Sequence, residues 1–133
     1  MDRFNQLKYA VDQLFGKGNP EMIDALFSDN YIAHSGNKSH KGHKFIKQYL
    51  KQIRTAIPDI KTAGIELLSQ ADNMVTWQRS FSGTHKSILK GIPASGRKVK
   101  WVEIVVSRFE ENKIAEEWVV SDLAFQLMLK QRR

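Results

Sequence analysis

An acidic side chain at the end of the last predicted strand is the first candidate for chemistry. Period-2 alternation places five residues on one face of that strand: Ile114, Glu116, Trp118, Val120 and Asp122. This face holds the larger apolar groups, so we expect it to look into a cavity with Asp122 at the rim. Burial favours the protonated form of a carboxylic acid, which suits a general acid or base. Capping of the following helix is the alternative role for Asp122, unless Ser121 is the cap.

Two histidines are candidates for assisting proton transfer, because imidazole titrates near neutral pH. His85 ends a second predicted strand, on the same face as Val75, Trp77, Arg79 and Phe81. His34 follows the second predicted helix and would reach the same cavity. The alternative for His85 is a structural role at the strand end, bonded to a loop carbonyl. The alternative for His34 is a surface position without a function. The pair His40 and His43 predicts no metal site, since no carboxylate is near and the neighbouring lysines repel cations.

The predicted walls of the cavity are aromatic. We expect a small molecule to contact Trp77, Phe81, Trp118, Arg79 and Tyr49. Packing alone is the alternative for each of the aromatic residues. The Tyr49 hydroxyl would supply a hydrogen bond to the ligand.

The elements that position these residues follow from hydrophobic periodicity. Helical spacing predicts helices over residues 4–15, from Pro20 to about residue 27, and from about residue 43 to Ala56. The residues Ser28-Asp29-Asn30 predict the end of the second helix and a loop. After Pro58 the pattern alternates and predicts four strands: one that includes Ile65 and Leu67, and others over 74–85, 99–109 and 114–120. A last helix over 123–130 ends in the cations Lys130, Arg132 and Arg133.

This order predicts one α+β domain over residues 1–133, in which N-terminal helices cover one face of a curved antiparallel sheet. Such a sheet under helices encloses a cone-shaped cavity that suits a small hydrophobic or aromatic ligand. The 133 residues are enough for a core without a metal or disulfide. With no cysteine, the chain has no disulfide, thiolate nucleophile or Cys-based zinc site.

The charge pattern raises a binding hypothesis of another class. The formal charge is +7, and seven cations lie between residues 38 and 61: Lys38, Lys41, Lys44, Lys47, Lys51, Arg54 and Lys61. They fit a solvated helix face better than a nucleic-acid or protein adaptor, because aromatic residues do not alternate with them as stacking platforms do. Charges interrupt every apolar run near the N-terminus, and no run is long enough to span a membrane. We therefore expect a cytoplasmic protein.

Short motifs follow one another in a specific order along the chain. They are Tyr31-Ile32-Ala33-His34, Ile57-Pro58-Asp59-Ile60, Gly83-Thr84-His85, Gly91-Ile92-Pro93, Gly96-Arg97, Arg108-Phe109, Lys113-Ile114, Glu117-Trp118 and Asp122. In this order and spacing they resemble the SnoaL-like polyketide cyclase family over about residues 5 to 128. The resemblance implies the cystatin-like fold of nuclear transport factor 2. Two stretches depart from the family pattern, Lys86 to Lys90 before Gly91 and the turn Glu111-Asn112.

The resemblance also implies an activity. Cyclases of this family close a ring by intramolecular aldol condensation without a metal or cofactor. In them an Asp at the position of Asp122 serves as acid–base and a His near His85 assists. A cyclase or isomerase is therefore the first functional hypothesis, and a non-catalytic module that binds a small ligand is the second. Dimerisation through the outer sheet face is expected, with Val105, Phe109 and Val119 as the apolar contacts.

Overall fold

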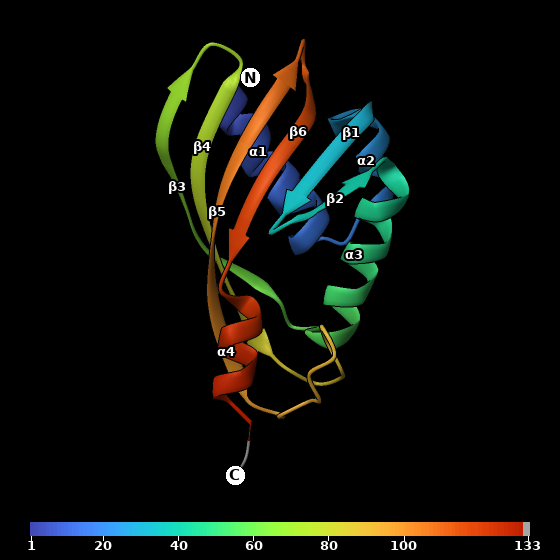
Figure 1. Ribbon diagram of the computed structural model, residues 1–133, viewed down its shortest axis with the longest axis vertical. Coiled ribbons are helices and arrows are strands. Elements are labelled where there is room, and N and C mark those ends of the chain that lie inside the picture. Colours follow the sequence, from blue (N-terminus) through green and yellow to red (C-terminus); the bar gives the residue numbers. More distant parts are fainter. Residues whose placement is uncertain (132–133) are drawn as a thin grey trace.

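Helices cover one face of a six-stranded curved sheet in the computed structural model, which describes residues 1–131 (Figure 1). The elements are α1 (Arg3–Val11), η1 (Asp12–Gly16), η2 (Pro20–Met22), α2 (Ile23–Leu26), β1 (Phe27–Ser35), β2 (Lys38–Lys41), α3 (His43–Ala56), β3 (Lys61–Ala71), β4 (Met74–Thr84), β5 (Lys98–Glu110), β6 (Lys113–Ser121) and α4 (Leu123–Leu129). The predicted α+β class is confirmed. The predicted C-terminal cations Arg132 and Arg133 lie outside the described residues.

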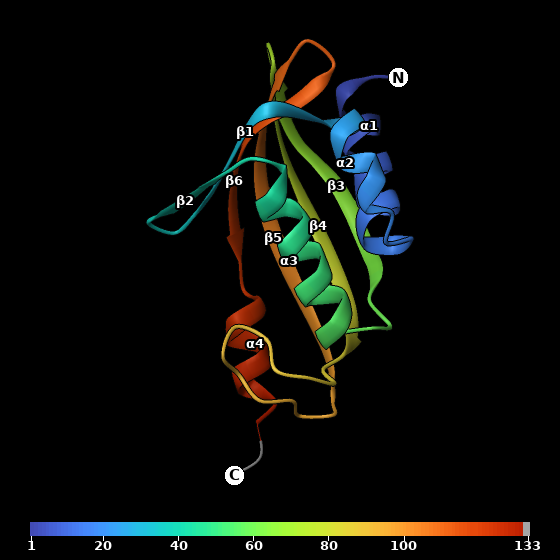
Figure 2. The same cartoon turned by 90° about the vertical axis from the view of Figure 1, so that its right-hand side faces the viewer.

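The sheet has the strand order β2-β1-β6-β5-β4-β3. Strands β3 to β6 form the predicted antiparallel meander, and β1 joins it by pairing parallel to β6. Figure 2 shows α3 lying over the sheet with α1 and α2 beside it, while α4 lies near one end of the strands. Within residues 1–131, no helix combines the length and apolarity that crossing a membrane requires.

The helices bury their apolar stripes against the sheet. In α3, Ile46, Leu50 and Ile53 are buried, while Lys44 and Lys51 are exposed, as the 3.6-residue period predicts. Helix α1 begins at an Asp2 cap, whose side chain accepts a hydrogen bond from the Asn5 amide at 2.8 Å. These stripes form one core with the concave face of the sheet.

Two strands were not predicted. The polar run from Ser28 to Asn30 has turn-forming composition, yet it belongs to β1, whose register against β6 is irregular between Phe27 and Ile32. Strand β2 is short, polar and at the sheet edge, where charged residues discourage pairing with other chains. The expected loop that carries His34 and His40 is therefore a hairpin.

The predicted orientation of β6 is wrong after Ala115. The register shifts there, because Phe109 pairs with Ile114 whereas Arg108 pairs with Glu116. The extra residue is a β-bulge, which reverses the alternation of the side chains that follow. Ile114 still faces the core, but beyond the bulge the inward positions belong to odd-numbered residues.

A glycine in β4 marks the closest approach of the sheet to the loop after α3. A Cβ atom at Gly83 would overlap Cγ2 of Ile57 and come within 3.2 Å of the backbone of Ile60. We expect Gly83→Ala to lower the free energy of unfolding by about 1–3 kcal/mol, the usual range for overpacking. The matched change Gly64→Ala, on a strand position with no atom within 4 Å, should be neutral or stabilising by up to about 1 kcal/mol. Urea unfolding compares them, and equal midpoints would contradict the close contact.

Candidate active site

A cavity of about 360 Å³ lies between the helices and the concave sheet face. Its interior is apolar, with walls from α1, η1, α3 and the central strands. The buried apolar lining residues include Leu7, Val11, Leu14, Phe15, Leu50 and Trp77. A cavity of this size, apolar with a few polar groups, is typical of a small-molecule site.

A buried carboxylate, Glu117 on β6, lines this cavity. Its side chain is only 6% exposed. The Tyr31 hydroxyl donates to its Oε1 at 2.8 Å, and the Ser107 hydroxyl donates to its Oε2 at 2.5 Å. Ser107 is in turn oriented by the Trp77 indole N–H, which donates to its Oγ at 2.9 Å. Three strands thus hold the carboxylate in one position.

An ion pair lies beside this network on β4 and β5. Nε of Arg79 is 2.7 Å from Oε1 of Glu103, which is 2% exposed. The guanidinium also lies over the rings of Phe15, Trp77 and Phe81, at 5.3, 5.3 and 5.7 Å from their centroids. Burial by itself lowers the pKa of Arg79, but Glu103 and Glu117 outweigh this effect and raise it. The cavity therefore contains two carboxylates and one permanent cation.

Two tyrosines supply protonated hydroxyl groups to the cavity. Burial, followed by the charge of Glu117, raises the pKa of Tyr31 far above its usual value. Burial and the charge of Glu103 raise the pKa of Tyr49 as well. Among residues 1–131, the Tyr49 hydroxyl has no hydrogen-bond partner, although Tyr49 lines the cavity. This hydroxyl is therefore available to a bound molecule as a donor.

The expected pocket residues fall into two groups. Trp77, Arg79 and Tyr49 line the cavity. Phe81 shares the β4 face of Trp77 and Arg79 but packs in the core, where its ring centroid lies 4.8 Å from that of Phe15 and 5.5 Å from that of Trp101. The prediction for Trp118 is wrong in orientation, because the bulge turns it to the outer face, where it is 37% exposed.

Asp122 lies where β6 ends, outside the cavity lining. Its Oδ1 accepts the Val102 amide at 2.8 Å, and its Oδ2 accepts the Gln126 side-chain amide at 3.1 Å. Ser121, not Asp122, accepts the backbone N–H of Leu123 at the start of α4, at 3.2 Å. Asp122 occupies the N-cap position of α4, but its side chain makes no hydrogen bond to the backbone of the first turn. Its carboxylate instead ties β5 to α4.

The two candidate histidines lie apart from each other. His85 is fully buried at the end of β4, and neither ring nitrogen has a hydrogen-bond partner among the described residues. His34 borders the cavity, but its ring stacks on Trp118 with a centroid distance of 5.1 Å. Its Nε2 is 2.6 Å from Oε2 of Glu116, and this hydrogen bond is the main reason that the pKa of Glu116 is lowered. His34 therefore belongs to a cluster on the outer face.

Four polar residues of the site were missed from the sequence. Glu103 carried a signal, because it is a charged residue in phase with Trp101 and Val105 in an apolar strand. Period-2 alternation along β6 places Glu117 on the outer face, because the sequence pattern does not reveal the bulge. Tyr31 and Ser107 could not be recognised without β1 and its pairing.

Comparisons with known proteins agree with this fold. The model of the SnoaL-like polyketide cyclase family matches residues 5–129. A SnoaL-like polyketide cyclase from Agrobacterium tumefaciens is 27% identical, with a TM-score of 0.75, and the alignment covers 97% of this chain and 99% of that one. TsrD from Streptomyces laurentii is 20% identical, with a TM-score of 0.80 over 96% of this chain and 97% of that one. No curated protein sequence matches the chain.

Proposed function

The chain belongs to the SnoaL-like polyketide cyclase family, and we propose on this basis that it is an enzyme that moves a proton next to the carbonyl group of a small, largely apolar substrate. The observation that carries the proposal is Glu117, a carboxylate buried in an apolar cavity and fixed by two hydroxyl donors. Such a group is poorly hydrated and well oriented, which suits a general base.

The other polar groups fit the charge that develops in this reaction. When Glu117 takes a proton from the carbon next to a carbonyl, the C–H electron pair moves into the carbonyl and leaves an enolate oxygen. The Arg79 guanidinium and the Tyr49 hydroxyl are the donors available to that oxygen. Glu103 holds Arg79 in place and balances its charge while the site is empty. The proposed chemistry uses side chains alone.

Ring closure or isomerisation would complete the cycle. In an aldol cyclisation, the enolate carbon forms a bond to a second carbonyl carbon of the same molecule. The new alkoxide then takes back the proton held by Glu117, so the base is regenerated. In an isomerisation, the proton returns to a different carbon instead.

Two alternatives compete with Glu117 as the general base of an enzyme. The family resemblance proposes Asp122 as the acid–base with His85 assisting, and the position of His34 in the sequence adds it as a second assisting group. A non-catalytic module that binds a small hydrophobic ligand would use the same cavity without proton transfer. The network around Glu117 favours catalysis, because an apolar ligand by itself gives no reason to bury two carboxylates.

A generic ketone tests the proposal without knowledge of the natural substrate. The wild-type protein is expected to accelerate deuterium incorporation from D₂O into the carbons beside the carbonyl of 2-tetralone, followed by proton NMR. A binding module would protect the ketone or leave the exchange at the buffer rate. Exchange at the buffer rate despite saturation of the cavity would therefore reject proton transfer.

We also propose a cytoplasmic homodimer formed through the outer sheet face. Of the residues expected to form it, Val105 and Phe109 are fully buried in the core, and Val119 lines the cavity and packs against the core. The outer face has its own apolar strip, in which Val120 is 73% exposed and pairs with Ile104, beside Trp118 and Val106. A strip of this kind marks an interaction surface.

Light scattering tests the homodimer. The wild-type protein should elute at twice the monomer mass, and Val120→Glu should give the monomer mass because a charge would be desolvated at the interface. The matched change Thr76→Glu introduces the same charge on the partly exposed face of β4, in register with Val106 of that strip. It should weaken the dimer less. A monomeric wild type would reject the proposal.

A further inference from the structure

The mouth of the cavity carries a charge pattern that the proton-transfer proposal does not use. The interior holds two carboxylates, Glu103 and Glu117, and one cation, Arg79, whereas the exposed part of the lining carries Lys38 and Lys90. Among the described residues, neither lysine forms a salt bridge. The exposed lining in residues 1–131 has no carboxylate, so the charge exposed at the mouth is positive.

Lys90 is held at this mouth by local structure. It lies in the loop that departs from the family pattern, at a two-residue turn closed by hydrogen bonds between Leu89 and Ile92, at 3.1 and 2.8 Å. Leu89 is buried and fixes the turn to the core. Both central residues have positive φ, 52° for Lys90 and 76° for Gly91, which is the geometry of a type I′ turn.

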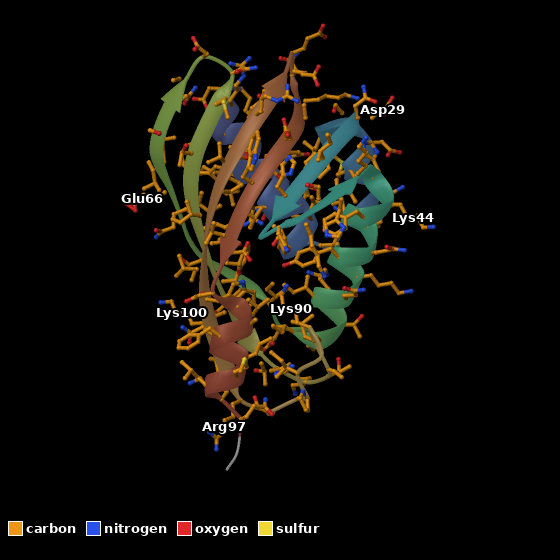
Figure 3. All side chains as sticks on the ribbon, in the orientation of Figure 1. Asp29, Lys44, Glu66, Lys90, Arg97 and Lys100 are labelled. Carbon is orange, nitrogen blue, oxygen red and sulfur yellow. The ribbon has the colours of Figure 1, made fainter. Side chains whose placement is uncertain are left out.

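Asn, Asp or Gly fits the Lys90 position better than Lys does, because a left-handed conformation is unfavourable for a residue with a long side chain. The turn nevertheless holds Lys90 in that conformation, beside the cavity wall. Its Nζ lies 6.0 Å from the ring centroid of Tyr49, a residue of the cavity wall. Figure 3 shows Lys90 between α3 and α4 in this view, while Lys44 points into solvent from the other side of α3.

A row of aromatic rings lines the cavity next to Lys90, beginning on α3. The rings of Tyr49 and Phe45 stack at 6.3 Å, and the rings of Phe45 and His40 stack at 4.2 Å. All three residues line the cavity, and Lys38 lies two residues before His40 on β2. A flat ligand would thus meet aromatic faces on its way in, and the ammonium groups of Lys38 and Lys90 belong to the same lining.

We propose that the cavity selects substrates that carry a carboxylate at the end that remains in the mouth, while their carbonyl group reaches Glu117. This inference rests on the proposed function and adds the substrate class: planar apolar keto acids. The two lysines would attract the anion during approach and hold it after binding. An uncharged ketone of the same shape would bind through the apolar walls alone.

Two probes of matched shape test this preference: 2-naphthoate and the neutral ketone 2-acetylnaphthalene. Their dissociation constants are measured by quenching of tryptophan fluorescence, since Trp77 lines the cavity. The wild type should bind the carboxylate about tenfold more tightly, as expected for two partly screened ion pairs. Raising the ionic strength from about 0.1 M to 1 M, where the Debye length falls from about 10 to 3 Å, should remove most of this difference.

The double variant Lys38→Gln, Lys90→Asn should lose the tenfold preference and keep its affinity for the neutral ketone within about twofold. The control Lys44→Gln, Lys51→Gln removes the same charge from exposed positions outside this cavity, and it should keep the preference. Equal binding of both probes by the wild type, or an equal loss in the control, would overturn the charge preference alone. Failure of both probes to bind would overturn it together with the proposed use of the cavity.

Discussion

Replacing Glu117 by Gln is expected to slow the exchange of 2-tetralone protons by roughly 100- to 10,000-fold, the usual contribution of a general base. The amide has the shape of the carboxylate, and its oxygen can still accept the Tyr31 hydroxyl that lies 2.8 Å from Oε1. It cannot take up a proton at neutral pH. The variant should therefore remain folded by circular dichroism while it loses the exchange activity.

The neighbouring residue supplies a matched control. Glu116→Gln makes the same chemical change one residue away, on the opposite face of β6, where Glu116 contacts His34 and Arg108. This variant should keep at least about a third of the wild-type rate, since Glu116 lies on the outer face and changes at independent positions have independent effects. A loss in Glu116→Gln with no loss in Glu117→Gln would contradict the assignment and favour the cluster around His34.

Replacing Arg79 by Met is expected to cause the largest loss of stability, about 3–5 kcal/mol, because it leaves Glu103 buried without its cation. Glu117 would add to the repulsion in the same cavity. Protonation relieves a buried carboxylate that has lost its partner, so the destabilisation should be smaller at low pH than at neutral pH. Urea unfolding at two pH values measures both effects.

Two further variants separate charge burial from lost packing. The double variant Arg79→Met, Glu103→Leu removes both charges and should recover most of the stability, as apolar replacements of buried ion pairs often do. Arg108→Met breaks the more exposed pair with Glu116 and should cost at most about 1 kcal/mol. An Arg79→Met variant as stable as the wild type would show that Glu103 does not depend on the ion pair.

The sequence was sufficient for the framework that carries the site. The helical stripe of α3, the meander from β3 to β6 and the inward face of β4 with Trp77 and Arg79 follow from hydrophobic periods of 3.6 and 2. In α3 and β4 these patterns are long and uninterrupted. The order of the motifs was sufficient for the family as well, since the family model covers residues 5–129.

The polar centre of the site depends on features that periodicity does not encode. A single bulge at Ala115 exchanges the faces of Glu117 and Trp118, so the residue expected outside lies inside. The parallel pairing that brings Tyr31 to Glu117 joins residues 86 positions apart. Its strand begins in a polar segment that local composition assigns to a turn, so tertiary pairing overrides the local preference.

The exchange rates of Glu117→Gln and Asp122→Asn, measured side by side on 2-tetralone, test the central claim most directly. We expect the rate of Glu117→Gln to fall to near the buffer rate. We expect Asp122→Asn to keep at least about a tenth of the wild-type rate, because the Asp122 carboxylate is engaged by Val102 and Gln126 outside the cavity lining. The reverse order, with Asp122→Asn inactive but folded and Glu117→Gln active, would contradict the central claim and move the acid–base role to Asp122.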